Sequence, residues 1–99
     1  MDINELKQRA LNAIEDNSEQ WINIGNILYE MPEVGFKEYK TSAFVKKVLR
    51  DTGLYVEDRI ALTGLKAVAR GRKHTANVAV LGELDSLIMP NHRGADHVT

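Results

Sequence analysis

The feature that most constrains the fold is a nearly continuous apolar run at residues 77–83, NVAVLGE. A run of this kind, without alternating polar residues, is typical of a strand that is covered on both faces at the centre of an α/β sheet. Such a strand needs neighbouring strands and packed helices. The chain has 99 residues, which is enough for one small domain or for part of one.

The first part of the chain predicts two amphipathic helices. Asp2 and Glu5 fit a capping box at the start of the first helix. Ser18 can cap a second helix, which Pro32 ends because its ring disfavours helical geometry in the preceding residue. We expect the two helices to form a hairpin that packs on a sheet.

A third helix is predicted over residues 37–52, followed by Gly53 as a left-handed cap. Its apolar face consists of Thr41, Phe44, Val45, Val48 and Leu49. Its basic residues, Lys40, Lys46, Lys47 and Arg50, are expected to form a solvated face.

Two shorter strands are predicted after this helix, over residues 54–57 and 65–70, with a turn at Thr63-Gly64. Together with the strand at residues 77–83, they predict an α/β fold in which N-terminal helices precede the strands of a mixed or parallel sheet.

Charge and composition argue against several classes of partner. Thirteen Lys and Arg residues against fourteen Asp and Glu residues give a net charge of −1, so no basic surface for nucleic acid is expected. No apolar run approaches the ~18 residues of a membrane span. The absence of cysteine excludes disulfides and thiolate zinc sites within these residues, and a cytoplasmic location is the default expectation.

Two carboxylates close the predicted central strand. Glu83 and Asp85 are two residues apart, so a strand would point both side chains to the same face. One interpretation is a metal site or an acid/base pair at the carboxyl end of the strand, where α/β sheets bind ligands. The other, which the spacing alone favours, is a pair of polar residues where the strand meets water.

The residues after this strand include further metal-ligand types. His92, Asp96 and His97 could converge with Asp85 on a metal ion. However, the spacing of the two histidines matches no recognised ligand pattern, and solvated loop residues are the better interpretation. His74 is expected to lie in an exposed loop flanked by basic residues.

Five segments, in register, resemble the M-twenty metallopeptidases and amidohydrolases. They are residues 29–42 (YEMPEVGFKEYKTS), 49–53 (LRDTG), 61–65 (ALTGL), 81–87 (LGELDSL) and 90–99 (PNHRGADHVT). The last two are most similar to the branch that cleaves N-acyl amino acids, aminobenzoyl-glutamate and related amides. The resemblance covers essentially the whole chain.

The resemblance implies a hydrolase in which two divalent metal ions, usually zinc or manganese, activate a water molecule that attacks an amide carbonyl. Residues 1–99 then correspond to the N-terminal part of a zinc-peptidase-like catalytic domain and end before the metal-ligand segment. We therefore expect this chain alone to bind no metal and to be inactive. The full-length enzyme would act on a small amide or peptide and form a homodimer.

Asp85 is the one catalytic-site residue that the resemblance assigns. It matches the second acidic position of the strand-end motif, whose carboxylate supports a metal-binding histidine in the family. Glu83 falls where this branch usually has an acidic residue and other branches have a metal-binding histidine, so its role stays open.

Two alternatives remain on sequence grounds. The chain could be a short binding or regulatory module derived from the enzyme fold. Less favoured is a small self-sufficient metalloprotein that uses Asp85, His92, Asp96 and His97.

Overall fold

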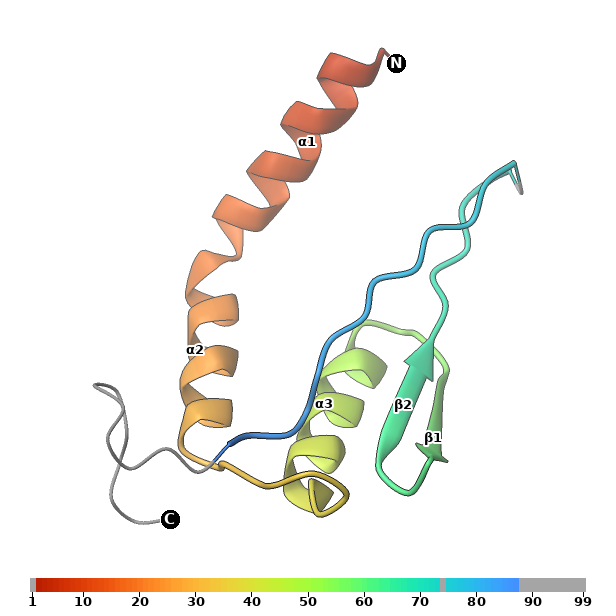
Figure 1. The fold of residues 1–99 in the computed structure, drawn as a ribbon. Coiled ribbons are helices and arrows are strands. Elements are labelled where there is room, and N and C mark those ends of the chain that lie inside the picture. The colour runs from red at the N-terminus through yellow and green to blue at the C-terminus, as the bar shows by residue number, and fades with distance from the viewer. Residues whose placement is uncertain (1, 74, 88–99) are drawn as a thin grey trace. The chain divides into compact units, whose positions relative to one another are not determined.

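The computed structural model of the chain describes residues 2–73 and 75–87. Three helices precede two strands: α1 (Ile3–Asp16), α2 (Ser18–Tyr29), α3 (Tyr39–Asp51), β1 (Val56–Ile60) and β2 (Gly64–Ala67) (Figure 1). The predicted α/β class, with helices first and strands after, is therefore confirmed. The chain divides into two compact units, residues 1–30 and residues 31–99, and each is considered by itself below.

The first unit consists of α1 and α2. The Asp2 carboxylate accepts a hydrogen bond from the Glu5 backbone N–H at 2.8 Å, as the predicted cap requires. Asn17 alone separates the helices, and its side-chain amide donates to the Ala13 carbonyl at 2.7 Å. The two helices follow one another end to end (Figure 1). The predicted hairpin is therefore wrong, because one connecting residue is too short to reverse the chain. The N-cap of α2 is Asn17 and not Ser18.

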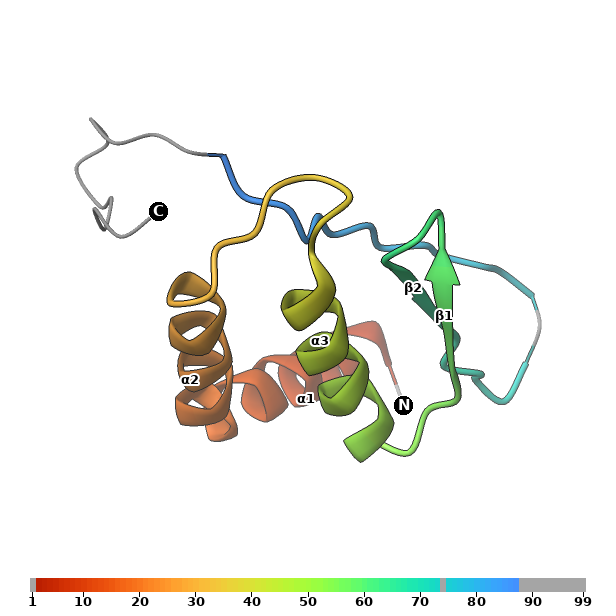
Figure 2. The same ribbon diagram turned by 90° about the horizontal axis from the view of Figure 1, so that it is seen from below.

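The second unit is built on α3 and a two-stranded hairpin. β1 and β2 pair antiparallel, with Val56 opposite Ala67 and Glu57 opposite Lys66, and the register shifts between Glu57 and Ile60. The hairpin packs against α3 (Figure 2). Val56 is 7% exposed on this packed face. The predicted strands at 54–57 and 65–70 are thus real but displaced, and the described pairing is antiparallel.

The face that α3 presents to the rest of this unit agrees with the prediction. Thr41 is buried, and Phe44, Val45, Val48 and Leu49 are half-buried. Gly53 has a φ of 90°, so its predicted left-handed conformation is also confirmed.

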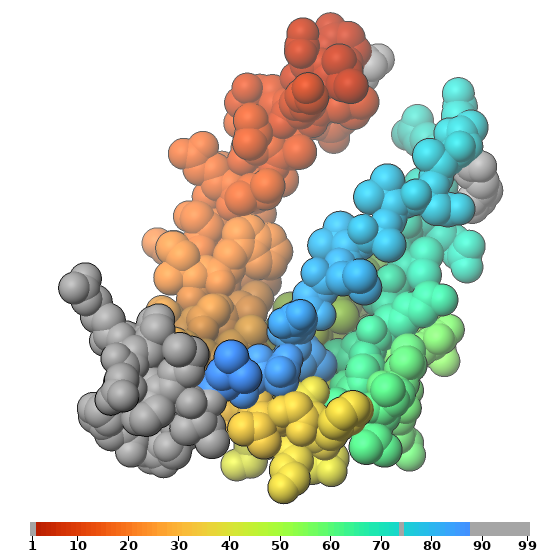
Figure 3. Space-filling view, in the orientation of Figure 1, coloured from red at the N-terminus to blue at the C-terminus, as the bar shows by residue number. Residues whose placement is uncertain are grey.

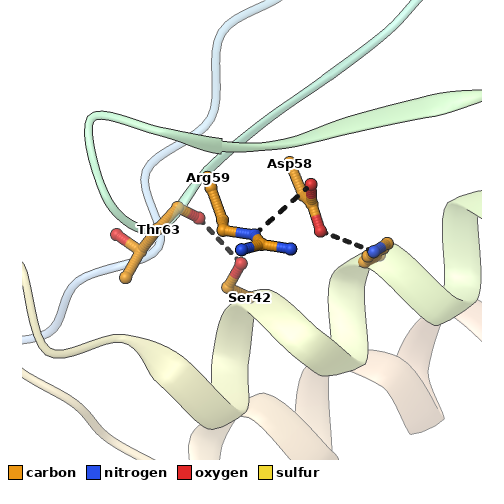
Figure 4. Close-up of polar contacts among 5 residues, drawn as sticks. Ser42, Asp58, Arg59 and Thr63 are labelled. Carbon is orange, nitrogen blue, oxygen red and sulfur yellow. Dashed lines mark hydrogen bonds and ion pairs between the residues drawn. The ribbon is translucent and has the colours of Figure 1, made fainter.

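The expected solvated basic face is wrong at Lys46. Its ammonium group lies 2.6 Å from the Asp58 carboxylate on β1, and its side chain is only 30% exposed. Arg59 approaches the same carboxylate (Figure 4), with its Nε 4.0 Å away. The Lys46 hydrogen bond, more than its charge, holds the pKa of Asp58 below the ordinary value. A residue expected to face water therefore joins the helix to the hairpin.

Residues 77–83 do not form the predicted buried strand. They have no regular secondary structure, and Val78, Val80 and Leu81 are 89%, 92% and 95% exposed. The physical reason is the lack of a partner: within the described residues, no neighbouring strand pairs with this segment. The apolar run has the composition of a central strand without the sheet that would cover it.

Candidate functional site

Glu33 is the centre of the polar contacts at the start of α3. Its two carboxylate oxygens accept hydrogen bonds from the backbone N–H groups of Thr41, at 2.6 Å, and Lys40, at 3.2 Å. The first N–H groups of a helix have no partner within the helix, and the helix N-terminus favours negative charge. Glu38 occupies the formal N-cap position but makes no side-chain cap hydrogen bond. Glu33 therefore caps α3 from the preceding loop.

These hydrogen bonds also set the ionisation of Glu33. Partial burial raises the pKa of its carboxyl, but the hydrogen bonds from Thr41 and Lys40, with the Lys40 charge, outweigh that effect. The net result is a pKa below the ordinary value. Glu33 is therefore held in the ionised form that a helix N-terminus prefers.

A second set of contacts ties the hairpin turn to α3. The Thr63 hydroxyl donates to the Glu38 carboxylate at 3.0 Å. The Ser42 hydroxyl donates to the Thr63 carbonyl at 2.7 Å, as Figure 4 shows. Glu38 and Thr63 are 8% and 5% exposed. The other carboxylate oxygen of Glu38, Oε1, is buried and has no hydrogen-bond partner among the described residues. The two hydrogen bonds of Thr63, with Glu38 and with Ser42, fix the turn between β1 and β2 beside the first turn of α3.

Asp85 lies beside the loop that carries Glu33. The backbone N–H of Ser86 donates to the Glu33 carbonyl at 2.7 Å. A Cβ atom built on Gly35 would lie 4.0 Å from Asp85 Oδ2. In the space-filling view, the segment at residues 84–87 (blue) lies against this loop (yellow) (Figure 3). The carboxylate of Asp85 is exposed, so it is accessible to a ligand or to another segment of chain.

The other predicted site residues do not form a site in the described part of the chain. Glu83 is exposed, and its role stays open. His74, His92, Asp96 and His97 lie outside the described residues, so their part in a metal site is not tested. Within residues 2–73 and 75–87, no group of three or more His, Cys, Asp or Glu side chains could hold a metal ion. The described residues therefore do not fit a metal centre by themselves.

Sequence reasoning missed the residues that form the polar contacts. Glu33 and Glu38 fall in the motif at residues 29–42, and Thr63 in the motif at residues 61–65. Their presence in these two motifs was the available signal. Glu33 contacts Thr41 across eight positions, and Glu38 contacts Thr63 across 25, beyond the reach of local capping patterns.

The chain is similar to several curated hydrolases. It is 36% identical over 84 residues to thermostable carboxypeptidase 2 of Saccharolobus solfataricus, covering 84% of this chain and 21% of that protein. It is 34% identical over 82 residues to N-acetyldiaminopimelate deacetylase of Bacillus pumilus, covering 79% of this chain and 21% of that protein. It is 28% identical over 80 residues to N-acetyl-L-cysteine deacetylase of Bacillus subtilis, covering 81% of this chain and 19% of that protein.

The chain spans about one fifth of the length of these curated relatives. No family model matches it, and no solved structure matches it significantly. The similarity nevertheless runs through most of the chain in peptidases and deacetylases alike, which confirms the family resemblance seen in the sequence.

Proposed function

Since the chain is homologous to a segment of the M-twenty metallopeptidases and amidohydrolases, we propose that it forms part of a hydrolase acting on N-acyl amino acids or related small amides. One observation carries this proposal: 79–84% of the chain aligns with a carboxypeptidase and with a deacetylase at 34–36% identity. Both kinds of enzyme cleave a C–N amide bond. Amide hydrolysis is therefore the reaction that they share.

Within this proposal, Asp85 belongs to the active site. It follows the apolar segment at the position where the family motif has its second acidic residue, and its carboxylate is exposed. The role of such a carboxylate is to orient a neighbouring group through a hydrogen bond. Loss of this kind of support costs about 10–100-fold in activity.

The two divalent ions of the family, zinc or manganese, would need ligands from outside residues 2–73 and 75–87, because those residues contain no group of three His, Cys, Asp or Glu side chains that could hold a metal ion. When bound, such ions supply an activated water molecule and polarise the amide carbonyl. The contribution of this chain is to hold the Asp85 carboxylate at the edge of the site.

The location and the partners also stay proposals. None of the helices in the described ranges is long and apolar enough to cross a bilayer. We retain a cytoplasmic location, a small-molecule substrate and a homodimer of the longer enzyme as predictions, without a role for nucleic acid or membranes.

The test is an assay of the natural polypeptide that carries these residues. It is purified, loaded with zinc or manganese, and incubated with a panel of N-acetyl amino acids, aminobenzoyl-glutamate and short peptides. The proposal predicts release of a free amino acid from at least one class. A folded protein that cleaves none of them contradicts it and favours a binding or regulatory module instead.

A further inference from the structure

We propose that Glu33 is a positioning residue that fixes the Asp85 segment to the N-terminus of α3. The consequence of this link for catalysis rests on the function proposed above. The structural link itself stands on separate contacts.

The first contact is the side-chain cap. The carboxylate accepts hydrogen bonds from two successive backbone N–H groups of α3, those of Lys40 and Thr41. Hydrogen bonds to an ionised acceptor are stronger than neutral ones. Because Glu33 lies outside the helix, this cap also holds the backbone of its loop in place.

The second contact uses the backbone of the same residue. The Glu33 carbonyl accepts the 2.7 Å hydrogen bond from the Ser86 N–H, the residue directly after Asp85. Gly35, two residues farther along the loop, comes near the Asp85 carboxylate itself. One residue thus joins the first turn of the helix to the segment that carries the proposed site carboxylate.

This link matters because the Asp85 segment is otherwise irregular. Residues 77–87 have no regular secondary structure, and most of their side chains are exposed. A functional carboxylate must be held within about 0.5 Å of its working position by its surroundings. The hydrogen bond from Ser86 to Glu33 supplies an anchor next to Asp85, and the helix cap makes that anchor rigid.

The experiment compares Glu33→Ala and Glu33→Gln in the natural polypeptide, with Glu57→Gln, an exposed carboxylate on β1, as the matched control. Amide hydrogen exchange and steady-state kinetics are measured together. In Glu33→Ala we expect the Ser86 and Thr41 amides to exchange about tenfold faster, since the local opening that exposes these amides then needs less free energy. We expect kcat to fall about tenfold with little change in KM. Glu33→Gln keeps an acceptor oxygen, so we expect its amide exchange rates and its kcat to return most of the way to the wild-type values.

Faster exchange at Thr41 alone, with Ser86 and kcat unchanged, would overturn the proposal and leave Glu33 as a simple helix cap. If Glu33→Ala does not fold, Ser86→Pro tests the same link, because it removes the donor and leaves the cap intact. It should lower kcat without changing exchange at Lys40 and Thr41; an unchanged kcat is evidence against positioning. A wild-type protein without hydrolase activity would refute the proposed function, whereas the exchange result at Ser86 still decides the structural link.

Discussion

At the scale of single residues, Glu33 combines two roles that are usually separate. Its side chain caps a helix, and its carbonyl holds a segment from the other end of the described chain. The local signals that sequence patterns capture were read correctly, namely the Asp2 cap and the left-handed Gly53. Glu33 could not be assigned in advance, because its partners depend on how a loop returns to the helix.

The lowered pKa of Glu33 predicts an acid-dependent loss of stability. A folded-state pKa below the unfolded value stabilises the fold above the unfolded pKa of about 4.3, and this contribution disappears as the pH falls through the lowered value. Glu33→Gln should therefore reduce stability at pH 7 and flatten its fall on acidification. Melting temperatures of the 99-residue chain from pH 7 to pH 2.5 measure this. The assignment would be contradicted if the melting temperature fell equally steeply with pH in Glu33→Gln, in the control Glu57→Gln and in the wild type.

Gly64 is required by a close approach of the backbone. A Cβ atom at this position would lie 2.5 Å from the Ile60 carbonyl oxygen across the hairpin. Gly64→Ala should therefore destabilise the second unit by about 1–3 kcal/mol, the usual cost of overpacking. Gly71→Ala is the matched control, because nothing lies within 4 Å of its Cβ position. Urea titration of both variants gives the comparison, and an undisturbed Gly64→Ala would show that the turn opens freely.

At the scale of elements, the packing of the hairpin on α3 depends on buried polar contacts more than on apolar ones. Val56 is the one buried hydrophobic residue in the described part of the chain, beside the buried polar residues Glu38, Thr41 and Thr63. Helices were predictable because their apolar residues recur at a regular spacing. Strand boundaries were not, since the register shift and the Lys46–Asp58 ion pair arise only when the hairpin meets the helix.

Thr63→Val tests this element-scale contact. Valine keeps the shape of threonine but removes the hydroxyl that donates to Glu38, leaving a buried carboxylate without that bond. The expected loss is about 1–3 kcal/mol of unfolding free energy. Thr75→Val, at an exposed loop position, should have little effect. Chemical denaturation distinguishes them; if both variants match the wild type, the hairpin is held by other contacts.

At the scale of the whole molecule, residues 77–83 are the part of the predicted sheet that the structure does not show as a strand. The composition of this segment is typical of a strand covered on both faces, yet a strand also needs partners. The curated relatives are about five times longer than the part that aligns with this chain. The mixed sheet therefore stays a prediction for a longer polypeptide.

The same segment predicts self-association of the 99-residue chain. Exposed apolar residues on an unpaired extended segment promote pairing between chains. Val80→Lys, which places a charge at a 92% exposed position, should lower the associated fraction. Tyr55→Lys, at an 82% exposed position outside the segment, is the control. Sedimentation velocity over a range of concentrations measures the effect, and equal association of the two variants would exclude residues 77–83 as the cause.

The central claim is that these residues form part of an amide-hydrolysing site, and Asp85 tests it most directly. The measurement is kcat/KM of the natural polypeptide on its best N-acyl amino acid, for the wild type, Asp85→Asn and the control Glu57→Gln. We predict measurable hydrolysis by the wild type, a loss of about 10–100-fold in Asp85→Asn, and no loss in Glu57→Gln. Unchanged turnover in a folded Asp85→Asn variant, or a wild type that hydrolyses no amide, would contradict the account.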